Sequence, residues 1–231
     1  MLKKLVVLTG AGISAESGIK TFRDSDGLWE NYRIEDVCTH DAWLHNTKVV
    51  IDFYNQRRKE LYNTKPNAAH EALVKLEDKY NIQIITQNID DLHERAGSRH
   101  VLHLHGELKK VRSSVDDDLI YDLDGWELKM GMKCEKGSQL RPHVVFFGEA
   151  VPNIMPAAEL AQQADIFVVI GTSLAVYPAA GLINYVSNSC PKYLVDPKDV
   201  SVSHIPNLTF IRKKAGEGVP ELVDKLLAAA E

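Results

Sequence analysis

The stretch Leu5-Val6-Val7-Leu8-Thr9-Gly10-Ala11-Gly12-Ile13-Ser14 decides the fold of this chain. An apolar run of strand length ends at Gly-Ala-Gly, and a polar, helix-compatible segment follows it. In parallel sheets, such a turn connects a strand to a helix whose free N–H groups hold a pyrophosphate. The spacing Gly10-x-Gly12-x-x-Ala15 fits the dinucleotide fingerprint in its Gly/Ala form, although ordinary tight turns also match it.

The segment that follows departs from the pattern of an ordinary dehydrogenase. About twenty residues after the glycines, a dehydrogenase places a ribose-binding acid at the end of a second strand. Here the chain reads Thr21-Phe22-Arg23-Asp24-Ser25-Asp26-Gly27-Leu28-Trp29, a polar loop that carries aromatic residues. The sequence therefore predicts NAD chemistry without the usual layout for hydride transfer.

Length and composition indicate a globular protein. The chain has 231 residues, of which 45% are apolar and 26% charged, enough for one large domain with an insertion or for two small ones. A net charge of −5 offers no basic surface to nucleic acid, and the apolar runs are too short for a membrane span. The cysteines Cys38, Cys134 and Cys190 are far apart, which excludes a disulfide framework and favours a cytoplasmic location.

Apolar strand-like segments alternate with helical ones along the chain. Continuously apolar strands, such as 166–170, are expected where helices cover both faces of a sheet. We therefore predict an α/β fold, a Rossmann-like doubly wound parallel sheet. The expected strands are 5–8, 82–86, 101–105, 166–170, 193–195 and 208–211; the expected helices are 68–79, 89–96, 155–164, 178–188 and 219–230.

Two segments interrupt this alternation. Residues 24–62 are rich in aromatic side chains and read as helical without strands, and residues 107–141 are polar and acidic. We expect a single catalytic domain over residues 1–231, in which both segments form a small inserted second domain. The active cleft is expected between this insertion and the sheet.

Polar residues follow two of the predicted strands. Gln87, Asn88 and Asp90 end one strand, where ligands bind in open α/β sheets. Two carboxamides and an acid suit a nicotinamide riboside, although Asn88 or Asp90 could equally serve as a helix cap. The corner Gly171-Thr172-Ser173 suits a phosphate or ribose, or equally a capped helix start.

Two histidines alternate with apolar residues in 101–106. His103 and His105 therefore point to one face of the predicted strand. A strand histidine is more often structural than catalytic, and His105 is the better catalytic candidate because it precedes Gly106 at the carboxyl end. Near neutral pH an imidazole can accept a proton from a ribose hydroxyl and return it.

Six motifs occur in the order found in the sirtuin family, which the chain resembles from about residue 5 to its last helix. Sirtuins are NAD-dependent protein-lysine deacylases, and the nearest resemblance is to bacterial class III members, which remove acetyl and succinyl groups. The motifs are Gly10-Ala11-Gly12-Ile13-Ser14, Thr21-Phe22-Arg23, Gln87-Asn88-Ile89-Asp90, His105-Gly106, Phe147-Gly148-Glu149 and Gly171-Thr172-Ser173.

The resemblance implies a role for each matching residue. His105 would be the general base that activates the nicotinamide ribose. Asp196 stands where the family commonly has Asn for the adenosine ribose, which puts that contact in doubt. The residues expected to bind NAD are Gly10, Ala11, Gly12, Ser14, Phe22, Arg23, Trp29, Gln87, Asn88, Asp90, Gly171, Thr172, Ser173, Asp196 and Ala215. Val144, Phe146, Phe147, Gly148 and Glu149 would pair with the substrate peptide as an added strand, or form a buried strand.

A tyrosine and an arginine narrow the class of acyl group that we expect the substrate to carry. Tyr54 and Arg57 are three residues apart and so share a helical face, where they could hold a carboxylate or simply face solvent. The same pair marks class III sirtuins that accept succinyl- or malonyl-lysine. We therefore expect acylated lysines of proteins as substrates, and neither nucleic acid nor a membrane as a partner.

The resemblance fails at the structural zinc. Sirtuins usually carry two cysteine pairs in the region matching 107–141, where this chain has only Cys134, with Ser113 near the first pair. Four-sulfur coordination is impossible, so we expect no zinc and no other metal. Because Asp124-Gly125 favours a type I′ turn, residues 119–130 are predicted to form a bracing β-hairpin.

The sequence therefore predicts an NAD-dependent protein-lysine deacylase that yields nicotinamide, O-acyl-ADP-ribose and free lysine. Two alternatives remain open. An ADP-ribosyltransferase or NAD glycohydrolase would share the first step but use another acceptor, and a non-enzymatic NAD-sensing module would bind NAD without turnover.

Overall fold

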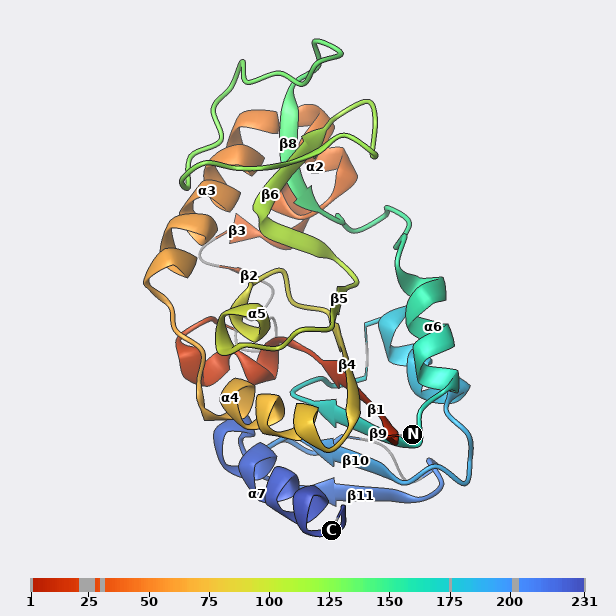
Figure 1. Cartoon of the computed structure of the whole chain (residues 1–231). Coiled ribbons are helices and arrows are strands. Elements are labelled where there is room, and N and C mark those ends of the chain that lie inside the picture. Colours follow the sequence, from red (N-terminus) through yellow and green to blue (C-terminus); the bar gives the residue numbers. More distant parts are fainter. Residues whose placement is uncertain (1, 21–27, 30–31, 175, 201–203, 231) are drawn as a thin grey trace.

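The computed structural model describes residues 2–20, 28–29, 32–174, 176–200 and 204–230 (Figure 1). Its main sheet has the strand order β11-β10-β9-β1-β4-β5, and every neighbouring pair is parallel. The strands are β1 (Lys4–Thr9), β4 (Asn81–Thr86), β5 (Val101–His103), β9 (Ile166–Ile170), β10 (Lys192–Val195) and β11 (Leu208–Ile211). The predicted parallel α/β sheet is confirmed.

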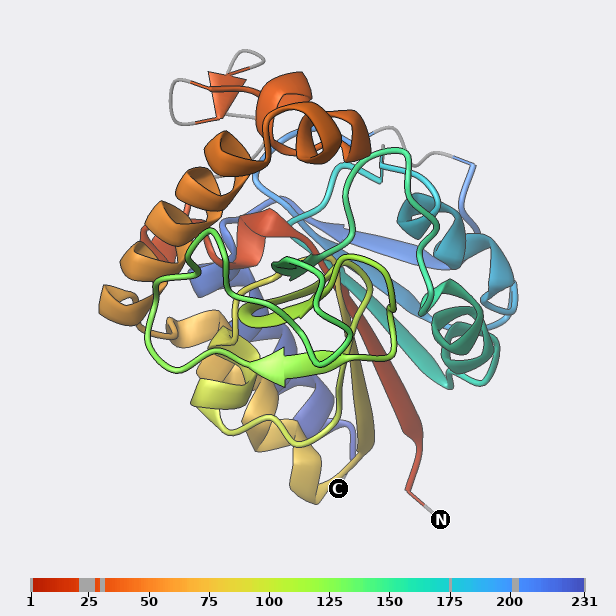
Figure 2. The same cartoon turned by 90° about the horizontal axis from the view of Figure 1, so that it is seen from above.

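Helices cover both faces of this sheet, which explains the continuously apolar strands. In β1, Leu5 and Val7 pack in one core beneath α4 (Ala68–Val74) and α7 (Ala215–Ala228), whereas Val6 and Leu8 pack in a second core beneath α6 (Ile154–Gln162). All four side chains are fully buried. Figure 2 shows these helices on opposite sides of the strands. A strand buried on both faces cannot alternate apolar with polar residues.

The predicted helices differ from the structure at their boundaries, and α7 begins at Ala215, four residues before the predicted start. The segment 178–188 forms a 3₁₀ helix, η5 (Ala179–Tyr185), and the helix predicted from residue 68 continues after α4 as the 3₁₀ helix η4 (Lys75–Asp78). Helix α5 spans Leu92–Ala96 and begins three residues later than predicted, because Asp90 Oδ1 accepts the Leu92 N–H at 3.2 Å.

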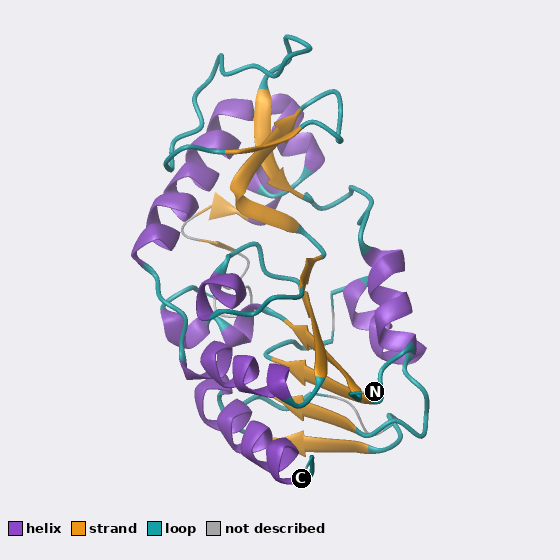
Figure 3. Cartoon of the chain, viewed as in Figure 1, coloured by secondary structure: helices purple, strands orange, loops and turns teal. Residues whose placement is uncertain are grey.

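A smaller unit lies beyond the carboxyl ends of the strands. It combines α2 (His40–His45) and α3 (Thr47–Asn63) with a three-stranded sheet in the order β7-β6-β8 (Figure 3). These strands are β6 (Gly106–Ser113), β7 (Ile120–Asp122) and β8 (Leu140–Val144), and both layers share one apolar core. Residues 24–62 were expected to lack strands, but β2 (Leu28–Trp29) pairs with β3 (Tyr32–Arg33), ahead of α1 (Ile34–Val37).

The predicted hairpin over 119–130 is wrong. Strand β7 pairs with Lys110–Arg112 of β6, and residues 126–130 form no strand. Side chains of α3 instead form hydrogen bonds with the backbone of residues 126–130. Asn55 donates to Leu128 O and accepts from Leu128 N, both at 2.8 Å. Arg58 also donates to Trp126 O at 2.8 Å. A backbone bonded to buried side chains cannot also form a ladder.

A small polar cluster joins the two turns where the resemblance to sirtuins would place a zinc ion. Cys134 Sγ lies 3.3 Å from Ser113 Oγ and 3.1 Å from Ser138 Oγ, and the two hydroxyls are 3.1 Å apart. Lys136 pairs with Asp116 across the same turns. One thiol and two hydroxyls do not suit tetrahedral zinc, and the described residues contain no group of three or more His, Cys, Asp or Glu that could hold a metal ion.

No helix in the described part of the chain is both long enough and apolar enough to cross a membrane.

Candidate active site

A cleft of about 740 Å³ runs between the carboxyl ends of the main sheet and the smaller unit. It brings together most of the residues predicted from sequence, including Gly10, Gln87, Asp90, His105 and Gly171. Predicted residues that also line it are Ala11, Gly12, Ser14, Asn88, Thr172, Ser173, Asp196, Ala215, Tyr54, Val144, Phe146, Phe147, Gly148 and Glu149. The cleft thus joins the predicted nucleotide and substrate residues in one cavity.

Three glycines allow the loops after β1 and β9 to touch. Gly12 N donates to Gly171 O at 2.9 Å, and Gly10 N donates to Ile170 O at 3.0 Å. A Cβ on Gly12 would lie 2.5 Å from Gly171 Cα, and Gly171 has a φ of +62°. The fingerprint glycines therefore serve backbone packing between neighbouring loops, in addition to leaving room for a phosphate.

Buried polar side chains form a network at the end of β4. Ser14 Oγ donates to Asp90 Oδ2 at 3.0 Å, while Asn88 Nδ2 donates to Ser14 Oγ at 3.1 Å and to Gly10 O at 3.2 Å. Burial raises the pKa of Asp90 to about 6. Asp90 also accepts the Leu92 N–H at the start of α5. The same carboxylate residue therefore binds the start of the helix and lines the cleft.

His105 is held in one tautomer by the backbone. Its Nδ1 lies 2.9 Å from Gln87 O, and a carbonyl oxygen only accepts, so Nδ1 carries the proton and Nε2 is the basic nitrogen. Burial lowers the pKa of His105 below its ordinary value, which keeps the ring neutral at pH 7. A neutral imidazole of fixed tautomer in a cleft can act as a general base.

His103 has a structural role instead. Its Nδ1 lies 3.1 Å from Asn88 O and its Nε2 lies 2.8 Å from Glu94 Oε1. Burial lowers the pKa of His103, but the hydrogen bond and charge of Glu94 outweigh burial and leave the pKa raised. The two histidines of the predicted strand therefore divide into one satisfied structural residue and one residue of the cleft.

Of the predicted carboxylate-binding pair, Tyr54 lines the apolar part of the cleft, whereas Arg57 is not among the described residues that line it. Tyr54 is 2% exposed and lines the cleft with Phe146 and Cys38. Arg57, one turn later on α3, is 8% exposed and pairs with Glu60 Oε2 at 3.0 Å. Cys38 is a cleft residue that sequence reasoning missed, since a single cysteine after a short helix carries no pattern.

The segment 145–149 is bonded to the chain itself and is not an open strand edge. Strand β8 ends at Val144, and Phe147 donates its N–H to Cys38 O at 2.8 Å and accepts from His40 N at 3.2 Å. Glu149 N donates to Phe146 O at 3.0 Å. The expected added strand therefore has few backbone groups left on this segment, and Gly148, with a φ of +89°, forms its turn.

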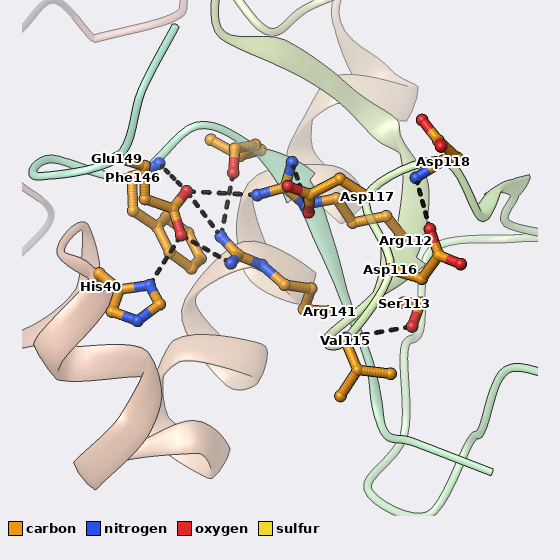
Figure 4. A network of polar contacts seen from close by, with 11 residues as sticks. His40, Arg112, Ser113, Val115, Asp116, Asp117, Asp118, Arg141, Phe146 and Glu149 are labelled. Atoms are coloured by element: carbon orange, nitrogen blue, oxygen red, sulfur yellow. Dashed lines mark hydrogen bonds and ion pairs between the residues drawn. The ribbon is translucent and has the colours of Figure 1, made fainter. Parts of the chain in front are cut away.

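Glu149 holds this segment through a buried ionic network (Figure 4). Arg141 binds both carboxylate oxygens, at 2.7 and 3.1 Å, and Arg112 lies 3.3 Å away. Glu149 Oε2 also accepts the Phe146 N–H at 2.9 Å. Burial opposes ionisation, but the hydrogen bonds from Arg141 and Phe146 lower the pKa of Glu149 to about 2. Glu149 thus positions the segment rather than offering a free carboxylate.

The two residues predicted to bind adenosine lie in the loop after β10 and at the start of α7. Asp196 is 3% exposed and accepts the Lys198 N–H at 2.9 Å. Ala215 begins α7, and the next residue, Gly216, donates its N–H to Glu16 Oε2 at 2.6 Å. Glu16 is a second residue that sequence reasoning missed, and its carboxylate occupies a favourable place at a helix N-terminus.

Three predicted residues cannot be placed as side chains. Phe22 and Arg23 lie outside the described residues, and Trp29 is described only through its backbone in β2.

Comparison with known proteins decides the family. The sequence model of the Sir2 family matches residues 10–178. The chain belongs to the Sir2 family. An NAD-dependent protein deacylase of Bacteroides thetaiotaomicron is 53% identical over 99% of this chain and 100% of its own length. One of Helicobacter pylori strain 26695 is 50% identical, with the same coverage of both chains.

Solved structures agree with this assignment. The crystal structure of a Sir2 homolog–NAD complex has a TM-score of 0.89 and 40% identity, and covers 100% of this chain and 91% of that one. A Sir2 variant with a deacetylated p53 peptide and 3′-O-acetyl ADP ribose has a TM-score of 0.78 and 32% identity, covering 99% of this chain and 94% of that one. The Rossmann-like fold of this Sir2 protein is therefore shared with proteins seen with NAD and with a peptide.

Proposed function

We propose that this Sir2 protein removes both acetyl groups and the dicarboxylate acyl groups succinyl and malonyl from protein lysines. The protein is an NAD-dependent protein deacylase, in keeping with its family and with the names of its relatives. One observation supports the proposed activity on dicarboxylate acyl groups. Tyr54 lies at the apolar end of the cleft, and Arg57 follows it on the next turn of the same helix. A phenol and a guanidinium together suit a carboxylate.

The residues present fit NAD as the co-substrate. Gly10, Gly12 and Gly171 let the two loops pack backbone against backbone where a Cβ would clash, and both loops line the same cavity as Asn88 and Asp90. NAD supplies the ribose carbon from which nicotinamide departs. We assign Gly10 to Ser14 and Gly171 to Ser173 to the phosphates and ribose, Asp196 and Ala215 to the adenosine, and Gln87 to Asp90 to the nicotinamide.

The chain's own chemistry centres on His105. Its Nε2 accepts a proton from a ribose hydroxyl, and the Gln87 carbonyl stabilises the resulting imidazolium through Nδ1–H. Phe146 and Phe147 form apolar walls beside this nitrogen's cavity and limit the entry of water. The side chain of the acylated lysine enters between these walls, so that its acyl end reaches Tyr54.

Mass spectrometry distinguishes this function from its alternatives. Acetyl- and succinyl-lysine peptides are incubated with NAD and the protein, with His105→Tyr as the inactive control. We expect O-acetyl- and O-succinyl-ADP-ribose together with the free lysine peptide. ADP-ribose attached to protein, or free ADP-ribose without deacylated peptide, would instead establish a transferase or a glycohydrolase, and NAD binding without turnover would indicate a sensor.

We also infer that the smaller unit folds without zinc. The cluster of Ser113, Cys134 and Ser138 and the ion pair of Asp116 with Lys136 join the turns that a zinc ion would join.

A further inference from the structure

The hydroxyl of Tyr54 has a weak partner at the apolar end of the cleft. Tyr54 Oη donates to Cys38 Sγ over 3.8 Å, and both residues line the cleft. Tyr54 is 2% exposed and Cys38 is 4% exposed. Burial raises the pKa of Cys38 to about 11 and that of Tyr54 well above its ordinary value. Both groups are therefore neutral at pH 7, with the phenol as donor and the sulfur as acceptor.

A thiol sulfur is a poor hydrogen-bond acceptor, so the Tyr54 hydroxyl can exchange Cys38 for a better acceptor. A buried hydroxyl needs a hydrogen-bond partner, and Cys38 provides one, although a weaker one than oxygen. A carboxylate oxygen that reached the same hydroxyl would form a shorter, charge-assisted hydrogen bond. The phenol can therefore leave the sulfur at small cost when a carboxylate arrives.

A positive charge lies near the same point. The Arg57 guanidinium is close enough that its charge lowers the pKa of Cys38, against the larger effect of burial. Cys38 follows α1, whereas Tyr54 and Arg57 come from α3. Thiol and phenol therefore meet at the acyl end of the cleft from separate segments of the chain, and Arg57 lies one turn after Tyr54 on α3.

We propose that Cys38 is a specificity-determining residue of the acyl pocket. Its sulfur accepts the hydrogen bond of the Tyr54 hydroxyl while a neutral acyl group fills the pocket. When a succinyl group binds, the hydroxyl donates to the succinyl carboxylate instead. This inference rests on the proposed dicarboxylate activity. It involves no covalent step at the sulfur, whose high pKa leaves it a thiol.

The backbone of Cys38 limits which substitutions are informative. Cys38 O accepts the Phe147 N–H at 2.8 Å, so a bulky replacement would also displace the wall of the peptide site. Serine and alanine are no larger than cysteine and preserve this contact. Serine replaces the sulfur with a stronger acceptor, and alanine removes the acceptor altogether.

The test is a double-mutant cycle. Cys38→Ser and Cys38→Ala are made alone and together with Tyr54→Phe, and kcat/KM is measured on acetyl- and succinyl-lysine peptides of one sequence. We expect Cys38→Ser to lower the succinyl-to-acetyl ratio about fivefold and Cys38→Ala to raise it about threefold, as for one exchanged hydrogen bond. In the Tyr54→Phe background, neither substitution should change the ratio.

Each result has one meaning. If Cys38→Ser and Cys38→Ala lower both activities equally, or shift the ratio as much without the Tyr54 hydroxyl, the inference is overturned while the proposed function stands. If Tyr54→Phe alone leaves the ratio unchanged, the Tyr54 hydroxyl does not bind the carboxylate and the inference is overturned, whereas the absence of succinyl turnover by the unsubstituted protein would refute the dicarboxylate activity itself. Thermal melting confirms folding of each variant, and the alanine variant alone completes the cycle if the serine variant is unfolded.

Discussion

Replacing Arg57 by Met should separate deacetylation from the proposed desuccinylation by this Sir2 protein. Arg57 follows Tyr54 by one turn on α3, and methionine keeps much of its apolar bulk while removing the charge. In the proposed binding mode the substrate lysine and NAD occupy other parts of the cleft, so activity on a neutral acetyl group should not change. A succinyl carboxylate should lose its counter-charge.

The magnitude follows from the contacts of Arg57. A hydrogen bond to a charged group contributes about 1.5–3 kcal/mol, which corresponds to about 10- to 150-fold in kcat/KM. Glu60 already pairs with Arg57 at 3.0 Å and is about half exposed, so part of the charge is neutralised. We therefore expect the lower part of that range, a loss of about 10- to 30-fold on succinyl peptides.

The assay compares kcat/KM for acetyl- and succinyl-lysine peptides of one sequence at saturating NAD. Lys59→Met is the matched control, because Lys59 lies on the same helix with its Nζ 5.1 Å from the Trp126 ring and away from the cleft. Acetyl activity should stay within about threefold for both variants. Equal losses on both peptides in Arg57→Met would refute the carboxylate role.

Further predictions concern stability and pH. Gly171→Ala should destabilise the fold by more than about 2 kcal/mol, because the position has a φ of +62° and no room for a Cβ, whereas Gly125→Ala, with a φ of +76° in open space, should cost about 1 kcal/mol in thermal melts. Glu149→Gln should cost about 3–5 kcal/mol in urea unfolding because Arg141 is left buried without its counter-ion; a loss near zero contradicts that network. Burial lowers the pKa of His70 to about 4, so between pH 6.5 and 4 the unfolded chain binds a proton that the folded chain does not. As the pH falls through this range, His70 should lower the free energy of unfolding by up to about 1.4 kcal/mol per pH unit, and His70→Gln should reduce the measured slope by that amount while the contribution of His93, whose pKa burial also lowers, remains. Chelation with EDTA should leave the melting temperature unchanged, and elemental analysis that found about one zinc per chain would overturn the metal-free assignment.

Local patterns in the sequence determined the class of fold and most of the cleft. Residues 5–8 and 166–170 are apolar throughout because both faces of each strand are covered, and this signal survives without any knowledge of contacts. The turn Gly10-Ala11-Gly12 and the polar ends of strands, from Gln87 to His105, are local as well. Their convergence follows because the carboxyl ends of parallel strands meet at one edge of a sheet.

Only the tertiary structure decided how the smaller unit and the acyl end are built. Asp124-Gly125 favours a hairpin locally, but Asn55 of α3 binds both backbone groups of Leu128, and a buried side-chain contact outweighs a turn preference. Likewise, the contact of Cys38, which follows α1, with Tyr54 of α3 joins residues sixteen positions apart. No spacing within either helix encodes such a contact, because it depends on how two elements pack.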